Sequence, residues 1–106
     1  MDQKYDDDEI FNRALTVFGS ENRLNKFREE CMEAAVEVDR LNNGRMDALN
    51  RLINEMADVS ITLEHARKVI KIWTGFDAVG KAIDRKTQKL IKQVKERERL
   101  NAVDSQ

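Results

Sequence analysis

The sequence contains no proline, one cysteine and four glycines, and aromatic residues make up only 6% of its 106 residues. Proline interrupts helices and glycine weakens them, so their scarcity favours long, uninterrupted helices. The single cysteine, Cys31, excludes a disulfide within the chain. Because Cys31 falls on an apolar position of a predicted helix, we interpret it as an unreactive core thiol.

The chain also lacks long apolar runs. No stretch approaches the roughly 20 residues that a membrane-spanning helix requires. The N-terminal residues, Met1 to Glu9, do not have the basic and then apolar order of a signal peptide. We therefore expect a cytoplasmic protein with no membrane partner.

Neither sign of charge dominates the sequence. The 19 Lys and Arg residues nearly balance the 20 Asp and Glu residues, which gives a net charge of −1 and no overall attraction to nucleic acid. The distribution is uneven, because the segment 81–106 holds twice as many basic as acidic residues. The last part of the chain is therefore locally basic.

Apolar residues recur at intervals of three and four along most of the chain, which predicts helices. The predicted helices run from a cap at Asp6–Asp8 to Gly19, from an N-cap at Ser20 to 42–44, from Leu49 to 73–75, and from 76–77 to about 95–99, with 101–106 frayed. Short connections between long helices favour antiparallel neighbours. The sequence therefore predicts a single all-α domain, residues 1–106, folded as an antiparallel four-helix bundle. Apolar stripes on all four helices also predict a dimer or higher oligomer, because one small bundle cannot bury them.

Two segments carry the same acidic pattern. Glu30 and Glu33 in the first correspond to Glu55 and Asp58 in the second, at a constant offset along the chain. Residues three apart share one face of a helix, so each segment presents two carboxylates together. If the two helices pack side by side, four carboxylates converge, and their mutual repulsion favours binding of a divalent cation.

An all-oxygen ligand set favours Mg²⁺, with Mn²⁺ as a substitute, over zinc. A di-iron site needs Glu-x-x-His on two helices, whereas the chain has one histidine, His65, which we interpret as a surface or packing residue. Mg²⁺ held by carboxylates commonly serves phosphate chemistry. The alternative interpretation is a solvated acidic face paired with Lys26, Arg28 or Arg51.

The order of these acids resembles a known family signature. Glu29-Glu30-x-x-Glu33, then 21 residues, then Glu55-x-x-Asp58, resembles the EExxE...ExxD motif of the MazG-like nucleoside triphosphate pyrophosphohydrolases, the all-α NTP pyrophosphatase superfamily. The likeness covers roughly residues 10–92. It extends to neighbouring positions, namely Phe18-Gly19, Lys26 and Ala57-Asp58-Val59.

The resemblance implies hydrolysis of an NTP or dNTP to the monophosphate and pyrophosphate by a dimeric or tetrameric enzyme. It implies that Mg²⁺ is held by Glu30, Glu33, Glu55 and Asp58. Glu29 would activate the attacking water or only pair with a neighbouring lysine, and these two roles are left open. The substrate-binding candidates are Lys26, Lys86 and Lys89.

Two positions depart from the family pattern. Lys89 stands where the family has Arg, so a bidentate grip on phosphate is lost, and Arg23 stands where many relatives have Gln. We interpret Phe18 and Trp73 as core residues at helix ends rather than as platforms for a base. The preferred base and sugar are therefore open.

Two other functions stand as alternatives. A non-catalytic helical interaction module would pack its apolar stripes against a partner and would be indifferent to Mg²⁺. A nucleic-acid-binding protein would use basic residues at helical spacing in the last helix, although the acidic cluster and the net charge argue against it. These basic residues are Lys81, Arg85, Lys86, Lys89, Lys92 and Lys95.

Overall fold

The computed structural model describes residues 6–105, and over that range the chain forms four α-helices. The helices are α1 (Asp7–Phe18), α2 (Ser20–Asn42), α3 (Ala48–Thr74) and α4 (Ala78–Asp104). The prediction of an all-α fold is therefore confirmed. Within residues 6–105, none of the helices has the length and apolar character needed to cross a membrane.

Two helices begin at aspartate caps. Asp6 Oδ1 accepts a hydrogen bond of 2.9 Å from the backbone N–H of Asp8 at the start of α1. Asp77 Oδ1 accepts one of 3.0 Å from the backbone N–H of Gly80 at the start of α4. Each cap satisfies a backbone donor that has no partner inside its helix, which fixes where the helix begins.

Glycines end α1 and α3. Gly19 and Gly75 have φ angles of 87° and 82°, a conformation that other residues rarely adopt. Ser20, the predicted N-cap, is instead the first residue of α2, and Gly19 takes the cap position without a side-chain hydrogen bond. At the other end of the chain α4 continues to Asp104, so the predicted fraying is wrong for residues 101–104, while residue 106 lies outside the described residues.

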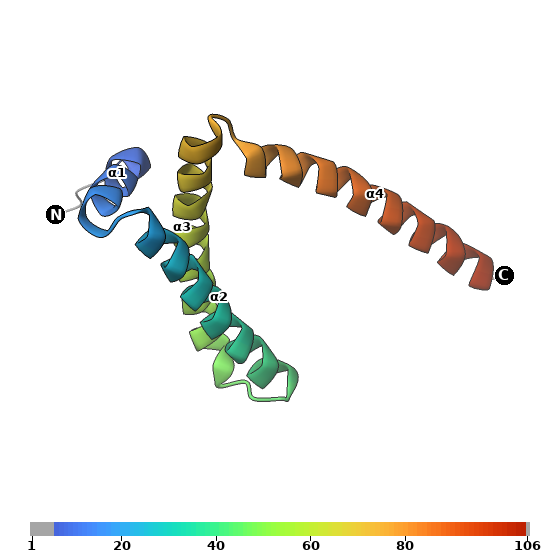
Figure 1. Ribbon diagram of the computed structural model, residues 1–106. Coiled ribbons are helices and arrows are strands. Elements are labelled where there is room, and N and C mark those ends of the chain that lie inside the picture. The colour runs from blue at the N-terminus through green and yellow to red at the C-terminus, as the bar shows by residue number, and fades with distance from the viewer. Residues whose placement is uncertain (1–5, 106) are drawn as a thin grey trace.

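α2 and α3 form an antiparallel hairpin, and α1 packs against its open end (Figure 1). The ring of Phe11 from α1 lies edge-on to the His65 ring of α3, with 5.5 Å between centroids. Lys68 Nζ of α3 lies 2.8 Å from Asp8 Oδ1. Phe11 and Val69 are buried between these helices, so the small core sits where α1 meets the hairpin.

α4 contacts α3 only near its first turns and then projects away from the other helices (Figure 1). None of its residues is buried. The radius of gyration is 18.6 Å, whereas a compact domain of this length has a value of about 13 Å. The predicted four-helix bundle is therefore wrong for a single chain, because three helices pack together and the fourth does not fold back.

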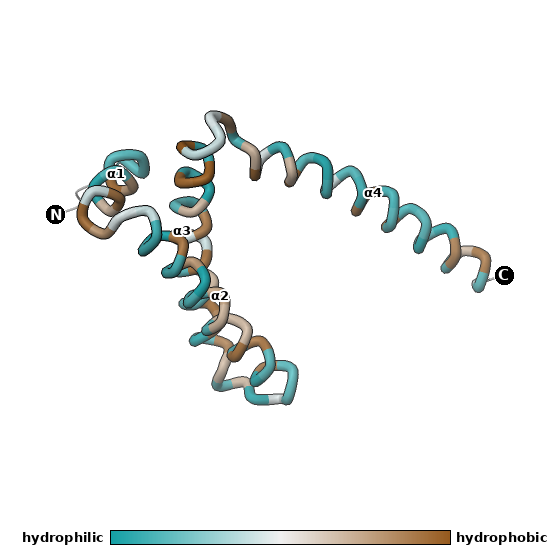
Figure 2. Tube along the Cα trace, viewed as in Figure 1, coloured by the Kyte–Doolittle hydropathy of each residue, from teal (hydrophilic) through white to brown (hydrophobic). Residues whose placement is uncertain are grey.

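Apolar residues recur along the hairpin and α4 (Figure 2). Many of their side chains are exposed. On α4 the mainly hydrophilic helix carries exposed apolar residues at helical spacing, namely Ile83, Leu90, Ile91 and Val94. Trp73 and Phe18 are 62% and 57% exposed, so their interpretation as core residues is wrong for the isolated chain. The predicted apolar stripes exist, but one chain leaves much of them in contact with water.

Candidate functional site

Three of the four predicted metal ligands converge between α2 and α3. One carboxylate oxygen from each of Glu30, Glu55 and Asp58 lies within 4.8 Å of the other two. Glu30 comes from α2 and the other two from α3, so the cluster depends on how the two helices align. Oxygens on opposite sides of an octahedral Mg²⁺ are about 4.2 Å apart, so this spread is close to what one ion needs.

Glu33 borders this group without belonging to it. Its side chain is exposed and interacts with the Glu55 carboxylate from the adjacent turn of α2. Burial first, and then the nearby Glu33 carboxylate, raise the pKa of Glu55. The structure therefore brings Glu30, Glu55 and Asp58 together and leaves Glu33 at the edge of the cluster.

Burial and repulsion weaken the acidity of Glu55. Burial is the largest cause, and interactions with Glu33 and then Glu30 add to it, which together raise the pKa of Glu55 from 4.5 to about 7. The raised pKa favours the protonated form of the Glu55 carboxyl when no cation is near. A neighbouring cation would favour the charged form and lower that pKa again.

Two oxygens of the cluster are buried without a hydrogen-bond donor. They are Glu30 Oε2 and Glu55 Oε2, and neither has a partner among residues 6–105. Glu30 is only 5% exposed, so water cannot readily take the place of the missing donor. A buried acceptor without a partner costs free energy, which a bound cation or a proton would recover.

Lys26 and Glu29 lie on the solvent side of the cluster. Lys26 Nζ is 3.4 Å from Glu30 Oε1 and 3.6 Å from Glu29 Oε2. Glu30 first, and then Glu29, raise the pKa of Lys26, which keeps its ammonium group charged. Lys26 therefore neutralises one oxygen of Glu30, while Glu30 Oε2 is left without a donor in the described part of the chain.

The alternative of a solvated acidic face predicted ion pairs with basic residues, and one of these pairs is present. Of its three basic residues, Lys26 alone forms an ion pair with the cluster over residues 6–105. Arg51 binds Glu37 and Asp47 instead. The burial of Glu30 distinguishes the cluster from a fully solvated surface.

The remaining predicted site residues lie elsewhere. Lys86 and Lys89 are exposed on α4, which leaves the hairpin at its open end, so a single chain does not bring them to the carboxylates (Figure 1). His65 is buried against Phe11, and its Nδ1 lies 3.5 Å from Arg23 Nη1. Burial, and then the charges of Arg23 and a nearby lysine, lower the pKa of His65 and keep the ring neutral. His65 is thus a packing residue, as predicted.

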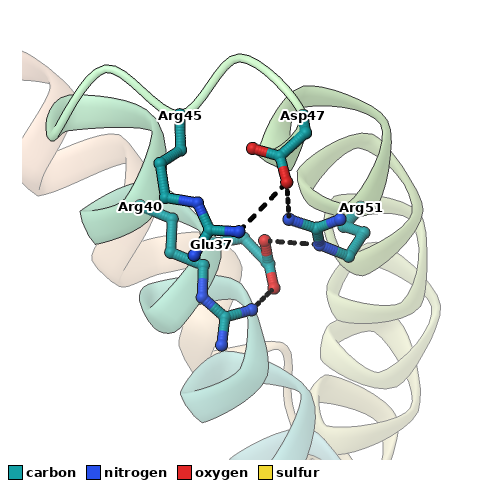
Figure 3. Close-up of polar contacts among 5 residues, drawn as sticks. All are labelled: Glu37, Arg40, Arg45, Asp47 and Arg51. Atoms are coloured by element: carbon teal, nitrogen blue, oxygen red, sulfur yellow. Dashed lines mark hydrogen bonds and ion pairs between the residues drawn. The ribbon is translucent and has the colours of Figure 1, made fainter.

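Sequence reasoning missed Glu37, a buried carboxylate two turns beyond Glu30 on α2. Glu37 is 6% exposed and accepts hydrogen bonds from two arginines (Figure 3). Arg40 Nη1 donates to Oε1 over 2.6 Å, and Arg51 Nε of α3 donates to Oε2 over 3.1 Å. The signal was present, because Glu37 follows Glu30 by one heptad and so lies on the same helix face.

Comparison with known proteins finds no matching family model, no matching curated protein and no matching solved structure. The likeness to the MazG-like family therefore stays a prediction that depends on the acidic motif. The function has to be argued from the chemistry of the carboxylate cluster.

Proposed function

We propose that the chain is a Mg²⁺-dependent nucleoside triphosphate pyrophosphohydrolase of the MazG-like type. Its substrate is an NTP or a dNTP, and its products are the monophosphate and pyrophosphate. The observation that carries the proposal is the convergence of Glu30, Glu55 and Asp58, with two buried oxygens that lack donors within residues 6–105. Acids that serve only solubility keep their oxygens in water, whereas Glu30 and Glu55 each bury one oxygen.

The chemistry of the donors supports Mg²⁺, with Mn²⁺ as a substitute. All of the donors are carboxylate oxygens, which hard divalent ions prefer. Glu30, Glu55 and Asp58 would hold the ion, and Glu33 would complete the set from the edge of the cluster. Bound Mg²⁺ supplies neutralisation of phosphate charge and a lowered pKa for a coordinated water.

Lys26 and Glu29 supply the groups that the reaction needs beside the ion. The charged Lys26 ammonium, next to the cluster, can exchange its carboxylate partners for a phosphate oxygen of the substrate. Glu29 is half exposed and accepts a proton from the attacking water. The water oxygen bonds to the α-phosphorus, the bond from that phosphorus to the bridging oxygen breaks, and pyrophosphate leaves.

Lys86 and Lys89 require a second copy of the chain. Because α4 projects from its own hairpin, we assign both lysines to substrate phosphates bound at the hairpin of a partner in a dimer or tetramer. The exposed apolar residues of α4 support such an assembly, since packing against another chain would bury them. The same contact would bring the basic helix near the acidic cluster, where the charges are complementary.

A panel of NTPs and dNTPs tests the proposal. Each nucleotide is incubated with the protein and Mg²⁺, and pyrophosphate is measured. We expect release from at least one nucleotide, activity with Mn²⁺, and none after a chelator removes the metal. Failure of every nucleotide to yield pyrophosphate would contradict the proposed function.

One observation favours a second candidate, the helical interaction module. α4 offers a long exposed helix with apolar residues such as Leu90 and Val94, which suits docking into another helical surface. This candidate predicts a partner-dependent change in stability and no response to Mg²⁺. The nucleotide panel therefore separates the two candidates.

A further inference from the structure

Two donor–acceptor contacts between side chains join α2 to α3 in the described part of the chain, one on each side of the carboxylate cluster. Successive pairs across the hairpin are separated by seven residues on each helix. From the open end to the turn, the pairs are Arg23 with His65, Glu30 with Asp58, and Glu37 with Arg51. The carboxylate cluster therefore lies midway between these two contacts, and all three depend on the same alignment of α2 against α3.

We propose that the ion pair between Glu37 and Arg51 sets the register of α2 on α3 and so positions Glu30 beside Glu55 and Asp58. Glu37 lies about two helical turns from Glu30, and Arg51 lies about one turn from Glu55. Both are positioning residues, since they act on the cluster through the alignment of the helices. The inference rests on the proposed function, because the cluster it concerns is the proposed Mg²⁺ site.

The burial of Glu37 explains how one ion pair selects a register. A carboxylate that is 6% exposed needs donors, and an alignment that removes a donor is disfavoured. Shifting α3 by one residue moves Arg51 by about 1.5 Å and turns it by about 100° around the helix, away from Glu37. Apolar stripes tolerate such shifts better, so a buried polar residue is the usual device that specifies register.

Arg40 provides a matched control within the same network (Figure 3). It binds the other oxygen of Glu37 over 2.6 Å, but it lies on α2 itself and moves with Glu37. Among residues 6–105, Arg51 is the one donor of α3 that binds Glu37, and Asp47 Oδ2 accepts a hydrogen bond of 3.3 Å from Arg51 Nη2. Loss of Arg40 therefore removes one hydrogen bond to Glu37 without allowing α3 to shift along α2. Loss of Arg51 allows that shift.

The first experiment measures register without using metal. Spin labels are placed on Arg28→Cys of α2 and Ser60→Cys of α3, both exposed, in a Cys31→Ser background. The dipolar coupling between the labels is then compared in chains that carry Arg51→Gln or Arg40→Gln. We expect a shifted or broader distance distribution with Arg51→Gln and an unchanged one with Arg40→Gln. Identical distributions in both would overturn the proposal.

The second experiment separates register from stability. Replacing the buried pair by Glu37→Leu and Arg51→Leu is expected to keep or raise the melting temperature, because apolar pairs often replace buried ion pairs at no cost. The same double variant should bind Mg²⁺ on the order of 10-fold more weakly, as supporting residues around a metal site typically show. A double variant that binds Mg²⁺ as the wild type does would overturn the proposal.

The results that would contradict the proposed function differ from those that would contradict the role of Arg51 in setting the register. A wild-type protein that binds no Mg²⁺ would remove the proposed function, but the spin-label distances would still decide whether Arg51 sets the register. Conversely, normal Mg²⁺ binding with an unchanged register in Arg51→Gln would remove the inference and leave the proposed function standing. Calorimetric titration with MgCl₂ supplies the affinities.

Discussion

The α2–α3 hairpin and α4 have the same pattern of apolar residues at helical spacing. However, α2 and α3 pack against each other, whereas α4 contacts α3 only near its first turns. α3 and α4 have the same length of 27 residues, but five residues of α3 are buried and none of α4 is. The hairpin holds the acidic cluster, while α4 carries an excess of basic residues. The contrast supports the proposed assembly, in which a second copy of the chain would supply what each region lacks.

Removing a cluster carboxylate should have the largest effect. Glu30→Gln keeps the shape of the side chain but removes its charge, so we expect turnover to fall by at least about 100-fold, given that changes outside the ligand set already cost about 10-fold to 100-fold. Circular dichroism should show unchanged helix content. The matched control is Glu21→Gln, an exposed acid on the same helix. Equal loss of turnover in both variants would show that turnover does not depend specifically on the carboxylate cluster.

A charge in the apolar face of α4 should separate the chains. The wild type should sediment with at least twice the chain mass of 12.3 kDa. Leu90→Asp should weaken association by about 100-fold, because in the proposed assembly it would remove an apolar contact and add a charge to the interface. Gln88→Asp adds the same charge on another face of α4 and should leave the mass unchanged. A monomeric wild type would contradict the assembly.

The stability of the metal-free hairpin should depend on pH through Glu55. Its pKa is about 7 in the folded protein and 4.5 ordinarily, so the folded state binds more protons between these values. The contribution of Glu55 to stability is therefore fully present below about pH 4.5 and is lost as pH rises through about 7. We expect Glu55→Gln to flatten this dependence in thermal melts, and Mg²⁺ to offset the loss above pH 7. An unchanged pH profile in Glu55→Gln would contradict this assignment.

The smallest effect on stability is expected from Lys26→Gln. Its ion pairs with Glu29 and Glu30 lie at the half-exposed edge of the cluster, where such pairs contribute little. The melting temperature should therefore hardly change. KM for the triphosphate should rise, because the proposed phosphate contact is lost. Normal KM together with a large drop in melting temperature would mean that Lys26 is only a structural residue.

Local features of the fold could be predicted from the sequence because short-range chemistry determines them. Asp6 caps α1 as expected, α4 begins next to the predicted position 76–77, and Gly19 and Gly75 end helices because they accept positive φ angles. The repeated acidic pattern also predicted that carboxylates of the two segments would converge, as those of Glu30, Glu55 and Asp58 do. These features involve neighbours on one helix or on two helices joined by a short turn.

Features that depend on packing could not be predicted in this way. The direction of α4 after Gly75 is not encoded by its own apolar stripe, since that stripe does not specify which surface covers it. The burial of Glu37 was missed because glutamate is usually exposed and its partner Arg51 lies on another helix. Glu33 was expected among the ligands, but its position on the helix leaves it at the edge of the cluster.

Hydrolysis in ¹⁸O-labelled water tests the central claim most directly, because it reports which phosphorus the water attacks. The protein is incubated with Mg²⁺ and the triphosphate that yields most pyrophosphate, and the products are analysed by mass spectrometry. Attack at the α-phosphorus predicts one labelled oxygen in the nucleoside monophosphate and none in the released pyrophosphate. Nucleoside diphosphate together with labelled orthophosphate would mean attack at the γ-phosphorus and would contradict the account.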